Sequence, residues 1–230
     1  MESTTTQFQN NRGILTDDDF SIIQRSNIVI VGLGGLGGHF ANNIVRLGVE
    51  HITLIDFDSF DESNLNRQLF SNHSAIGTPK ATVLKDALLN INPNCIIHTH
   101  IEKIENIDMS QFDHADFIID AVDTPTTKIY LSALSTTLNI PLLHGACAGW
   151  YGQIGWILPG CALLQETYEQ NIPGLEDKLL NPSFMPSAIA AIMTSEFVKF
   201  IQGSKETIIN QLLLIDLYNN TTIKTGDTNG

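Results

Sequence analysis

A cluster of glycines followed by a carboxylate forms the first group of residues whose types and spacing suggest chemistry. Gly32, Gly34 and Gly37 have the spacing G-x-G-x-x-G, and Gly35 adds a further glycine. Glycines at this spacing let the chain turn sharply and let its backbone approach a phosphate closely. Asp56 follows about 20 residues later, where its carboxylate can accept hydrogen bonds from a ribose. The pattern predicts a nucleotide-binding turn, and the alternative is a tight turn that binds nothing.

The sequence around these residues predicts the elements that must position them. Residues 28–31 are Ile-Val-Ile-Val, which is typical of a strand buried on both faces. The amphipathic run that ends at Leu47 predicts a helix whose free N–H groups and positive dipole end would face a phosphate. Residues 51–56 predict a second apolar strand that ends in an acid. Strand, glycines, helix, strand and acid in this order are more specific than the glycines alone.

Further polar side chains fall at the ends of predicted strands or shortly after them. These are Asp56 with Asp58, Asn64 with Arg67, Lys80, and Asp120 with Asp123. In open α/β sheets, ligands bind at the carboxyl ends of the strands, so we expect these side chains to converge there. Cations beside phosphates and a carboxylate for Mg²⁺ are what reaction at a nucleoside triphosphate requires. Each charge alone could be a surface charge or a strand-end cap, so the prediction depends on their convergence.

The wider pattern predicts an α/β fold. Strands and helices alternate as far as residue 145, and an apolar helix is expected over residues 185–201. Strands at residues 212–217 and 221–224 predict an antiparallel C-terminal extension to a Rossmann-like, mostly parallel sheet. Residues 1–10 are polar and are expected to be flexible. Residues 160–183 contain prolines and glycines without a clear period, which predicts a mobile crossover loop.

Composition restricts the class of protein. Of 230 residues, 43% are hydrophobic, and the formal net charge is −13, which repels phosphate and argues against nonspecific binding to nucleic acid or membranes. Cys95, Cys147 and Cys161 form no C-x-x-C pair, which excludes a disulfide framework and suits a reducing cytoplasm. No secretory signal is apparent, and no apolar run approaches the roughly 20 residues that cross a bilayer. We therefore expect a cytoplasmic globular protein.

At this point the chain resembles the MoeB/ThiF/HesA group, the bacterial relatives of the adenylation domain of ubiquitin-activating enzyme. The resemblance covers about residues 11 to 225, and dehydrogenases lack the Ser-Asn-Leu-Asn-Arg-Gln piece. The matching pieces are Gly32-Leu-Gly-Gly-Leu-Gly37, Leu54-Ile-Asp56-Phe-Asp58, Ser63-Asn64-Leu-Asn66-Arg67-Gln68, Gly77-Thr-Pro-Lys80, Ile91-Asn-Pro93 and Asp120-Ala-Val-Asp123. The resemblance implies a single adenylation domain over residues 11–230, with a nucleotide-binding core at about 27–145 and a carrier-binding and crossover part at about 146–225.

The resemblance also implies an activity. Such enzymes bind ATP, Mg²⁺ and the C-terminal Gly-Gly of a small ubiquitin-like carrier, whose carboxylate attacks the α-phosphate to give an acyl-adenylate and pyrophosphate. By position, Asp56 would hold the ribose, Gly35 would lie against the nucleotide, and Asp123 would bind Mg²⁺. The residues expected to bind the nucleotide are Gly32, Gly34, Gly35, Gly37, Asp56, Asp58, Asn64, Gln68 and Asp120, and the expected catalytic residues are Arg12, Arg67, Lys80 and Asp123.

Arg12 gains its role only through the resemblance. Asn11-Arg12 matches an N-terminal Asn-Arg whose arginine reaches the ATP of the other subunit, which implies a homodimer. Two departures from the family pattern are also visible. Leu164 stands three residues after Cys161, so we expect no structural zinc, and residues 165–186 contain no cysteine. We therefore expect an enzyme that stops at the adenylate, with a sulfur carrier as its protein partner, and Cys147 is either a substitute nucleophile or a small packed residue.

Three alternatives remain. A tRNA-modifying dehydratase of the same superfamily would use the same adenylation on a carboxylate carried by tRNA, although the negative charge opposes a tRNA partner. A non-catalytic partner subunit would keep the fold for dimerisation only, although Arg67, Lys80 and Asp123 would then have no use. A nicotinamide oxidoreductase would use Asp56, but it would have no use for the Asn-Leu-Asn-Arg-Gln segment.

Overall fold

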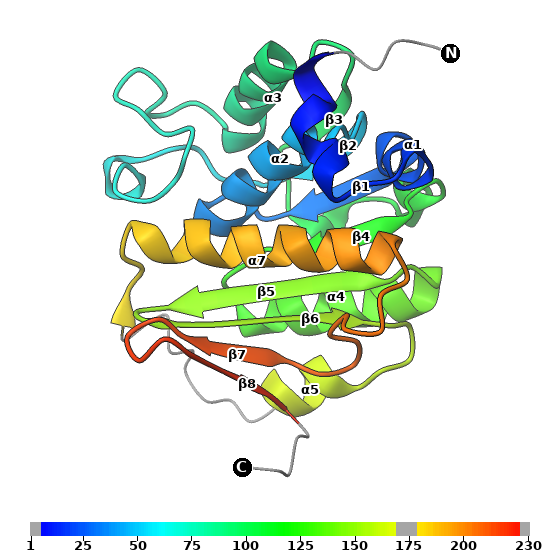
Figure 1. The fold of residues 1–230 in the computed structure, drawn as a ribbon. Coiled ribbons are helices and arrows are strands. Elements are labelled where there is room, and N and C mark those ends of the chain that lie inside the picture. Colours follow the sequence, from blue (N-terminus) through cyan, green and yellow to red (C-terminus); the bar gives the residue numbers. More distant parts are fainter. Residues whose placement is uncertain (1–5, 169–178, 226–230) are drawn as a thin grey trace.

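The computed structural model describes residues 6–168 and 179–225 of the chain. Its centre is an eight-stranded sheet in the order β3-β2-β1-β4-β5-β6-β7-β8, shown in Figure 1. Neighbouring strands from β3 to β5 are parallel, and the pairs from β5 to β8 are antiparallel. The expected α/β fold with a mostly parallel sheet and an antiparallel C-terminal extension is therefore confirmed.

The strands lie close to the positions that the sequence predicts. Their bounds are β1 Asn27–Val31, β2 His51–Ile55, β3 Ile96–His100, β4 Phe117–Asp120, β5 Leu142–Ala148, β6 Tyr151–Ile157, β7 Leu213–Asp216 and β8 Thr221–Lys224. Residues Ile28 and Ile30 of β1 belong to one hydrophobic cluster, and Val29 and Val31 belong to another. The central strand is therefore buried on both faces, as its unbroken apolar run predicts.

Helices cover both faces of the sheet. Their bounds are α1 Asp17–Arg25, α2 Gly35–Leu47, α3 Lys80–Ile91, α4 Pro125–Leu138, α5 Leu163–Tyr168 and α7 Phe184–Ile201, with short 3-10 turns η1 Thr6–Gly13, η2 Glu62–Asn64, η3 Ile104–Asn106 and η4 Met109–Phe112. Helices α2, α3 and α7 contribute to one hydrophobic cluster, and α4 and α5 contribute to the other. Figure 1 shows α7 in front of the sheet and α4 behind it. The sheet thus separates two cores.

The N-terminus differs in part from the flexible segment that the sequence predicts. Residues 6–13 form the 3-10 turn η1, and Phe8 is buried with its ring centroid 5.6 Å from that of Phe20. One aromatic side chain in a polar stretch is enough to attach this segment to the core. Thr16 caps α1, since its hydroxyl accepts from the backbone N–H of Asp19 and the Asp19 carboxylate accepts from the Thr16 backbone N–H, which completes a capping box.

The region from residue 145 to 183 also differs from expectation. Strand β5 continues to Ala148 and joins β6 through a tight turn at Gly149, whose φ is +57°. Within the predicted crossover loop, residues 163–168 form α5, whose Leu164 is fully buried. The expectation of a loop over residues 160–183 is therefore wrong for α5, and residues 169–178 lie outside the described part of the chain.

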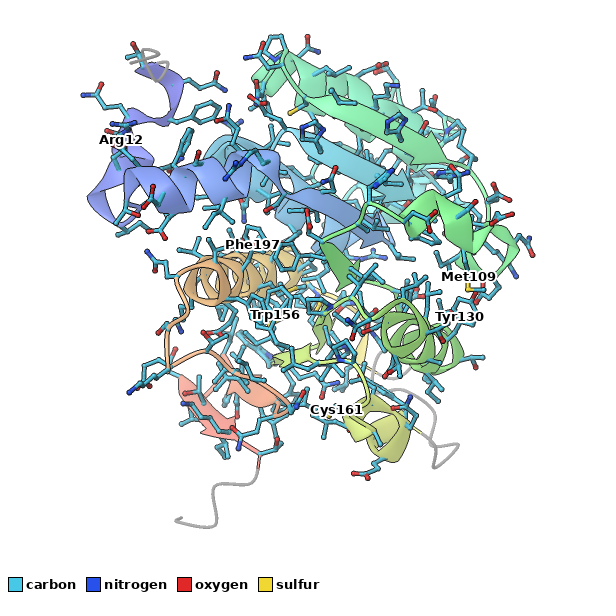
Figure 2. The ribbon with its side chains drawn as sticks, turned by 90° about the vertical axis from the view of Figure 1, so that its right-hand side faces the viewer. Arg12, Met109, Tyr130, Trp156, Cys161 and Phe197 are labelled. Atoms are coloured by element: carbon cyan, nitrogen blue, oxygen red, sulfur yellow. The ribbon has the colours of Figure 1, made fainter. Side chains whose placement is uncertain are left out.

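Helix α7 is the longest apolar element. By length and composition alone its 18 residues could cross a membrane, which the sequence analysis did not anticipate, but half of the helix is buried inside the molecule. Phe197 and Trp156, labelled in Figure 2, belong to the core between α7 and the sheet, and the Trp156 indole N–H donates to the Glu196 carbonyl at 3.2 Å. These contacts are those of a core helix.

Candidate active site

A cleft of about 440 Å³, the first cleft, lies at the carboxyl ends of β1, β2 and β4. Its walls include Gly32, Gly34, Gly35, Asp56, Asp58, Arg67, Gln68, Lys80 and Asp123. The structure therefore brings most of the expected site residues to one place, although they come from segments far apart in the sequence. The size of the cleft is within the range of small-molecule sites.

The glycine turn forms the end of the cleft between β1 and α2. Gly32 has a φ of +85°, and a Cβ atom there would lie 2.6 Å from the Ala121 carbonyl oxygen. A Cβ atom on Gly37 would lie 1.8 Å from the Gly32 carbonyl oxygen. Gly34 begins α2 without a side-chain cap, so the first N–H groups of the helix have no side-chain acceptor. Gly32 and Gly37 are thus required by close backbone packing, and the turn presents backbone N–H groups.

Asp56 joins the glycine turn to β2. One carboxylate oxygen, Oδ2, accepts from the Leu33 backbone N–H at 2.6 Å, and Oδ1 accepts from the Asp58 backbone N–H at 2.8 Å. Burial raises the pKa of Asp56, and the nearby Lys80 and the two backbone N–H groups oppose that shift. The carboxylate therefore fixes the turn as well as lining the cleft. A ribose bound in the cleft would donate to the same Asp56 carboxylate as these two backbone N–H groups.

Two cations reach the cleft with different partners. Lys80, at the start of α3, is 6% exposed, and its ammonium nitrogen lies 3.2 Å from Asp58 Oδ2. The Arg67 guanidinium donates to the Ser63 carbonyl oxygen and to Asn66 Oδ1, each at 2.9 Å. Within the described residues Arg67 forms no ion pair with a carboxylate. Its charge is therefore not cancelled by a direct carboxylate partner.

The cleft is nevertheless rich in acid. Five carboxylate side chains line it, those of Asp56, Asp58, Glu102, Glu105 and Asp123, against the three cations Arg67, Lys80 and Lys103. A polyphosphate bound there would need more positive charge than these side chains supply. The N–H groups at the start of α2 and a divalent cation on Asp123 are the available sources.

Besides Gly37, which packs within the glycine turn, three expected site residues do not line the first cleft. The side chain of Asn64 closes the cap of η2, where its Oδ1 accepts from the Asp61 backbone N–H at 3.3 Å. Arg12 lies on the outside of the molecule (Figure 2), where it pairs with Asp17 at 3.0 Å. Asp120 is fully buried and lies against two other groups, Lys128 and His144. Within this chain, Asn64 and Asp120 therefore stabilise the fold, and Arg12 lies on the surface.

The buried partners of Asp120 were missed by the sequence analysis. The Lys128 ammonium lies 3.4 Å from Asp120 Oδ1 and donates to the Gly145 carbonyl oxygen at 3.1 Å. His144 Nδ1 lies 2.6 Å from Asp120 Oδ2. Burial raises the pKa of Asp120, but Lys128 and His144 outweigh this and hold it below its usual value. The only available signal was His144 at the end of an apolar strand, since helical spacing alone does not distinguish Lys128 from a surface lysine.

Two side-chain oxygens at the first cleft have no partner. Gln68 Oε1 and Asn181 Oδ1 are buried, and neither accepts a hydrogen bond from the described residues. Both residues line the first cleft. Buried polar atoms without partners are costly, and a bound molecule is one way in which such atoms are satisfied. The sequence predicts Gln68 at the site but gives no indication of Asn181.

A second cleft of about 460 Å³ adjoins the first. It lies between α5 and the antiparallel strands, and it shares Asp123, Ala146 and Cys147 with the first cleft. Cys147 is buried in strand β5, as a small packed residue would be. These two clefts of the described part of the chain therefore meet at Asp123, which lines both.

The residues of the first cleft fit the cofactors that the sequence predicts. A nucleotide requires backbone N–H groups, cations and a carboxylate near the ribose, and the first cleft provides all three. In the described part of the chain no group of three or more His, Cys, Asp or Glu side chains could hold a metal ion. Mg²⁺ bound to a nucleotide commonly needs only one or two carboxylates besides phosphate oxygens. The single carboxylate of Asp123 therefore meets this requirement.

The chain is similar to several known proteins. The model of the ThiF family matches residues 8–228. The molybdopterin-synthase adenylyltransferase of Haemophilus influenzae is 30% identical over 190 residues, which cover 80% of this chain and 74% of that protein. The tRNA threonylcarbamoyladenosine dehydratase of Bacillus subtilis is 34% identical over 139 residues, which cover 60% of this chain and 55% of that protein.

The solved structures give the same fold. The crystal structure of E. coli MccB with MccA-N7isoASN has a TM-score of 0.78 and 17% identity, and the match covers 97% of this chain and 72% of that one. In two other curated relatives, which are longer proteins, the matching part covers only 22% and 30% of the relative's length. The family model, by contrast, covers nearly the whole chain. The chain therefore belongs to the ThiF family.

Proposed function

We propose that this chain is an ATP-dependent adenylyltransferase that activates the C-terminal carboxylate of a small carrier protein. The observation that carries the proposal is the convergence of Arg67, Lys80 and Asp123 on the cleft formed by the glycine turn. The similarity to the molybdopterin-synthase adenylyltransferase supports it. A dehydrogenase would need the turn and Asp56, but it would gain nothing from Arg67.

The reaction joins two anions, so the site must cancel their repulsion. In the proposed step a carboxylate oxygen bonds to the α-phosphorus of ATP, the bond from that phosphorus to the bridging oxygen breaks, and pyrophosphate leaves. Arg67 and Lys80 would hold the phosphates, and the N–H groups that begin α2 would add partial positive charge. When bound at Asp123, Mg²⁺ would neutralise charge on the phosphate oxygens. Holding both reactants in line supplies the rest of the acceleration.

The carrier and the assembly are the finer parts of the proposal. We propose that the substrate is a ubiquitin-like protein that ends in Gly-Gly, with a sulfur carrier as the preferred candidate. We also propose a homodimer in which Arg12 completes the site of the partner. Arg12 supports this because it is partly exposed and does not line the first cleft of its own chain. An arginine supplied in this way would reduce the excess of acid in the cleft.

The test is exchange of labelled pyrophosphate into ATP with small ubiquitin-like proteins that end in Gly-Gly. Exchange should require the carrier and should disappear when its two terminal glycines are removed. Arg67→Ala and Asp123→Ala should each reduce exchange by roughly 10²-fold or more, the usual cost of losing one electrostatic contact to the reacting group. The matched controls are Lys205→Ala and Asp86→Ala, exposed residues that line neither cleft.

Two results would overturn the proposal. One is exchange that survives both cleft variants, and the other is tight binding of NAD without any exchange. Sedimentation of the protein with and without ATP would test the homodimer separately. Mixing Arg12→Ala with Arg67→Ala should restore part of the activity if Arg12 acts across the interface, because one site of each mixed dimer is then intact.

A second candidate is supported by the similarity to the tRNA threonylcarbamoyladenosine dehydratase. It would use the same first cleft to adenylate a carboxylate carried by tRNA. The net charge of −13 opposes a polyanionic partner of that size. Exchange that depends on modified tRNA, and that no Gly-Gly carrier supports, would favour this candidate.

A further inference from the structure

The segment that leads into α7 is held by hydrogen bonds at two points. The Leu180 carbonyl oxygen accepts from the Gly149 backbone N–H at 2.8 Å, at the turn between β5 and β6. The Asn181 carbonyl oxygen accepts from Asn66 Nδ2 at 3.1 Å, and Figure 1 shows the start of α7 and the loop between β2 and α3 at the same end of the molecule. The position of residues 179–183 is therefore fixed through main-chain carbonyl groups.

The backbone of Leu180 shows that this position costs free energy. Its φ is +55°, in the left-handed region that residues with a Cβ atom rarely adopt. Its side chain is 73% exposed, so packing of that side chain does not explain the conformation. Such backbone strain persists where the surrounding structure fixes it, and here it places the next residue, Asn181, in the wall of the first cleft.

The side chain of Asn66 connects this segment to Arg67. Asn66 Oδ1 accepts from the Arg67 guanidinium at 2.9 Å, while Asn66 Nδ2 donates to the Asn181 carbonyl oxygen. The guanidinium also donates to the Ser63 carbonyl oxygen, which lies four residues earlier on the same loop. The contact through Asn66 therefore relates the charge of Arg67 to a part of the chain that lies 115 residues beyond Asn66 in the sequence.

The carboxamide of Asn181 is not engaged by the part of the protein that the structure describes. Its Oδ1 is buried without a donor, and its Nδ2 donates to no acceptor among the described residues. The residue is only partly buried, and it lines the first cleft together with Arg67 and Gln68. A phosphate offers acceptor oxygens only, so it would take the amide nitrogen. A carboxamide beside an arginine can thus donate to a phosphate without adding charge.

We propose that Asn181 is a further binding residue of the first cleft, whose Nδ2 donates to a phosphate oxygen of the nucleotide, and that Asn66 is a positioning residue, which holds the Arg67 guanidinium beside the same phosphates. The inference rests on the proposed function, because that function places ATP in the first cleft. It assigns part of the nucleotide site to a residue outside the expected core at about 27–145. The phosphates of the ligand, and not its base, are the groups that reach the segment before α7.

The first experiment measures the binding of ATP and of adenosine by isothermal titration calorimetry, with no carrier present. Asn181→Leu removes the hydrogen-bonding atoms and Asn181→Asp adds a negative charge, while both keep the main-chain carbonyl that Asn66 binds. Asn181→Leu should weaken ATP binding about tenfold or more, the usual cost of losing a hydrogen bond to a charged group. Asn181→Asp should weaken it further, because its carboxylate repels the phosphates. Adenosine carries no phosphate, so its affinity should stay unchanged.

Asn94→Asp is the matched control for the change of charge. Asn94 is exposed and lines neither cleft, so this variant should bind both ligands as the native protein does. Asn181 belongs to neither hydrophobic cluster, so the changes at Asn181 leave the core intact. A loss of affinity that is restricted to the ligand with phosphates is a result that a merely structural role of Asn181 would not produce.

A double-mutant cycle tests the role of Asn66. Asn66→Ala removes one acceptor of the Arg67 guanidinium, so in the native background it should weaken ATP binding about two- to tenfold. In the Arg67→Ala background the same change should have no further effect, because the group that Asn66 positions is then absent. Asn94→Ala should have no effect in either background. Losses that add in the double variant would overturn the positioning role.

The outcomes separate this inference from the proposed function. Asn181 variants that bind ATP as tightly as the native protein, or that lose affinity for adenosine equally, overturn the inference, and pyrophosphate exchange with a carrier then still supports adenylation. A loss that depends on the phosphates, without exchange for any carrier, supports the inference and overturns adenylation. A native protein that binds no ATP overturns both.

Discussion

Lys128→Met removes the one cation that, among the described residues, lies in direct contact with Asp120, and the cost of the change can be worked out from the burial of both groups. Lys128 and Asp120 are 1% and 0% exposed, and the ammonium also donates to the Gly145 carbonyl oxygen. Breaking a buried pair from one side typically costs about 3–5 kcal/mol, because the remaining charge stays buried without compensation. At about 2–4 °C per kcal/mol for a chain of this size, we expect Tm to fall by roughly 6–20 °C.

The pH dependence of this loss has a definite sign. In the native protein the pKa of Asp120 is lowered, so its stabilising contribution is present above the unfolded pKa and is lost as the pH falls through the folded one. Without Lys128, burial raises the pKa of Asp120, and the carboxylate destabilises the fold until it is protonated. The difference between the two proteins should therefore be largest near pH 7 and should shrink on acidification.

Urea unfolding followed by circular dichroism across this pH range measures both effects. Lys205→Met is the control, because Lys205 is exposed and such changes usually stay within about 0.5 kcal/mol. The double variant Asp120→Asn with Lys128→Met should recover part of the loss, since no unpaired carboxylate remains. A Lys128→Met protein as stable as the Lys205→Met control, or a loss that does not change with pH, would refute the reasoning.

Two further predictions concern close packing and thiol chemistry. Gly37→Ala puts a Cβ atom 1.8 Å from the Gly32 carbonyl oxygen, so it should distort the turn. We expect it to weaken ATP binding in calorimetry and to lower the free energy of unfolding by about 1–3 kcal/mol. Gly13→Ala is the control, because a Cβ atom at Gly13 has open space around it and should have none of these effects. Burial, with a smaller contribution from Glu50, raises the pKa of Cys95 to about 11, so iodoacetamide at pH 8 should label the partly exposed Cys161 well before Cys95. Mass spectrometry resolves the two sites, and equal labelling of both in the folded protein would contradict the burial argument.

Strong local patterns explain what the sequence made predictable. The unbroken apolar run of β1 has one common structural meaning, a strand buried on both faces, and the strand occurs as expected. Strand order and a shared sheet edge then bring Arg67, Lys80 and Asp123 together, although no local signal relates them. Phe8 and α5 were missed because a single buried aromatic ring, or a single buried leucine, decides the structure of an otherwise polar segment.

Asp120 and Asp123 show why the site was harder to predict than the fold. Asp120 ends the apolar strand β4 and Asp123 stands three residues later, and the sequence predicts both at the nucleotide. The last residue of β4, Asp120, points into the core and is enclosed by Lys128 and His144, whereas Asp123 follows the strand and lines both clefts. Side-chain direction alternates along a strand, and which direction is buried depends on helices distant in sequence.

Asp120 and Asp123 therefore have different roles. Asp120 Oδ2 lies 2.6 Å from His144 Nδ1, and His144 Nε2 lies 3.1 Å from the amide nitrogen of Gln153, so a chain of contacts joins the buried carboxylate to a residue that lines the second cleft. Asp123 is left with no ion pair in the described structure and lies where the two clefts meet. A carboxylate in that position can hold a cation between a nucleotide and the group that attacks it. The Asp-Ala-Val-Asp segment therefore contacts the lining of the second cleft indirectly, through its first acid, and places its second acid where both clefts meet.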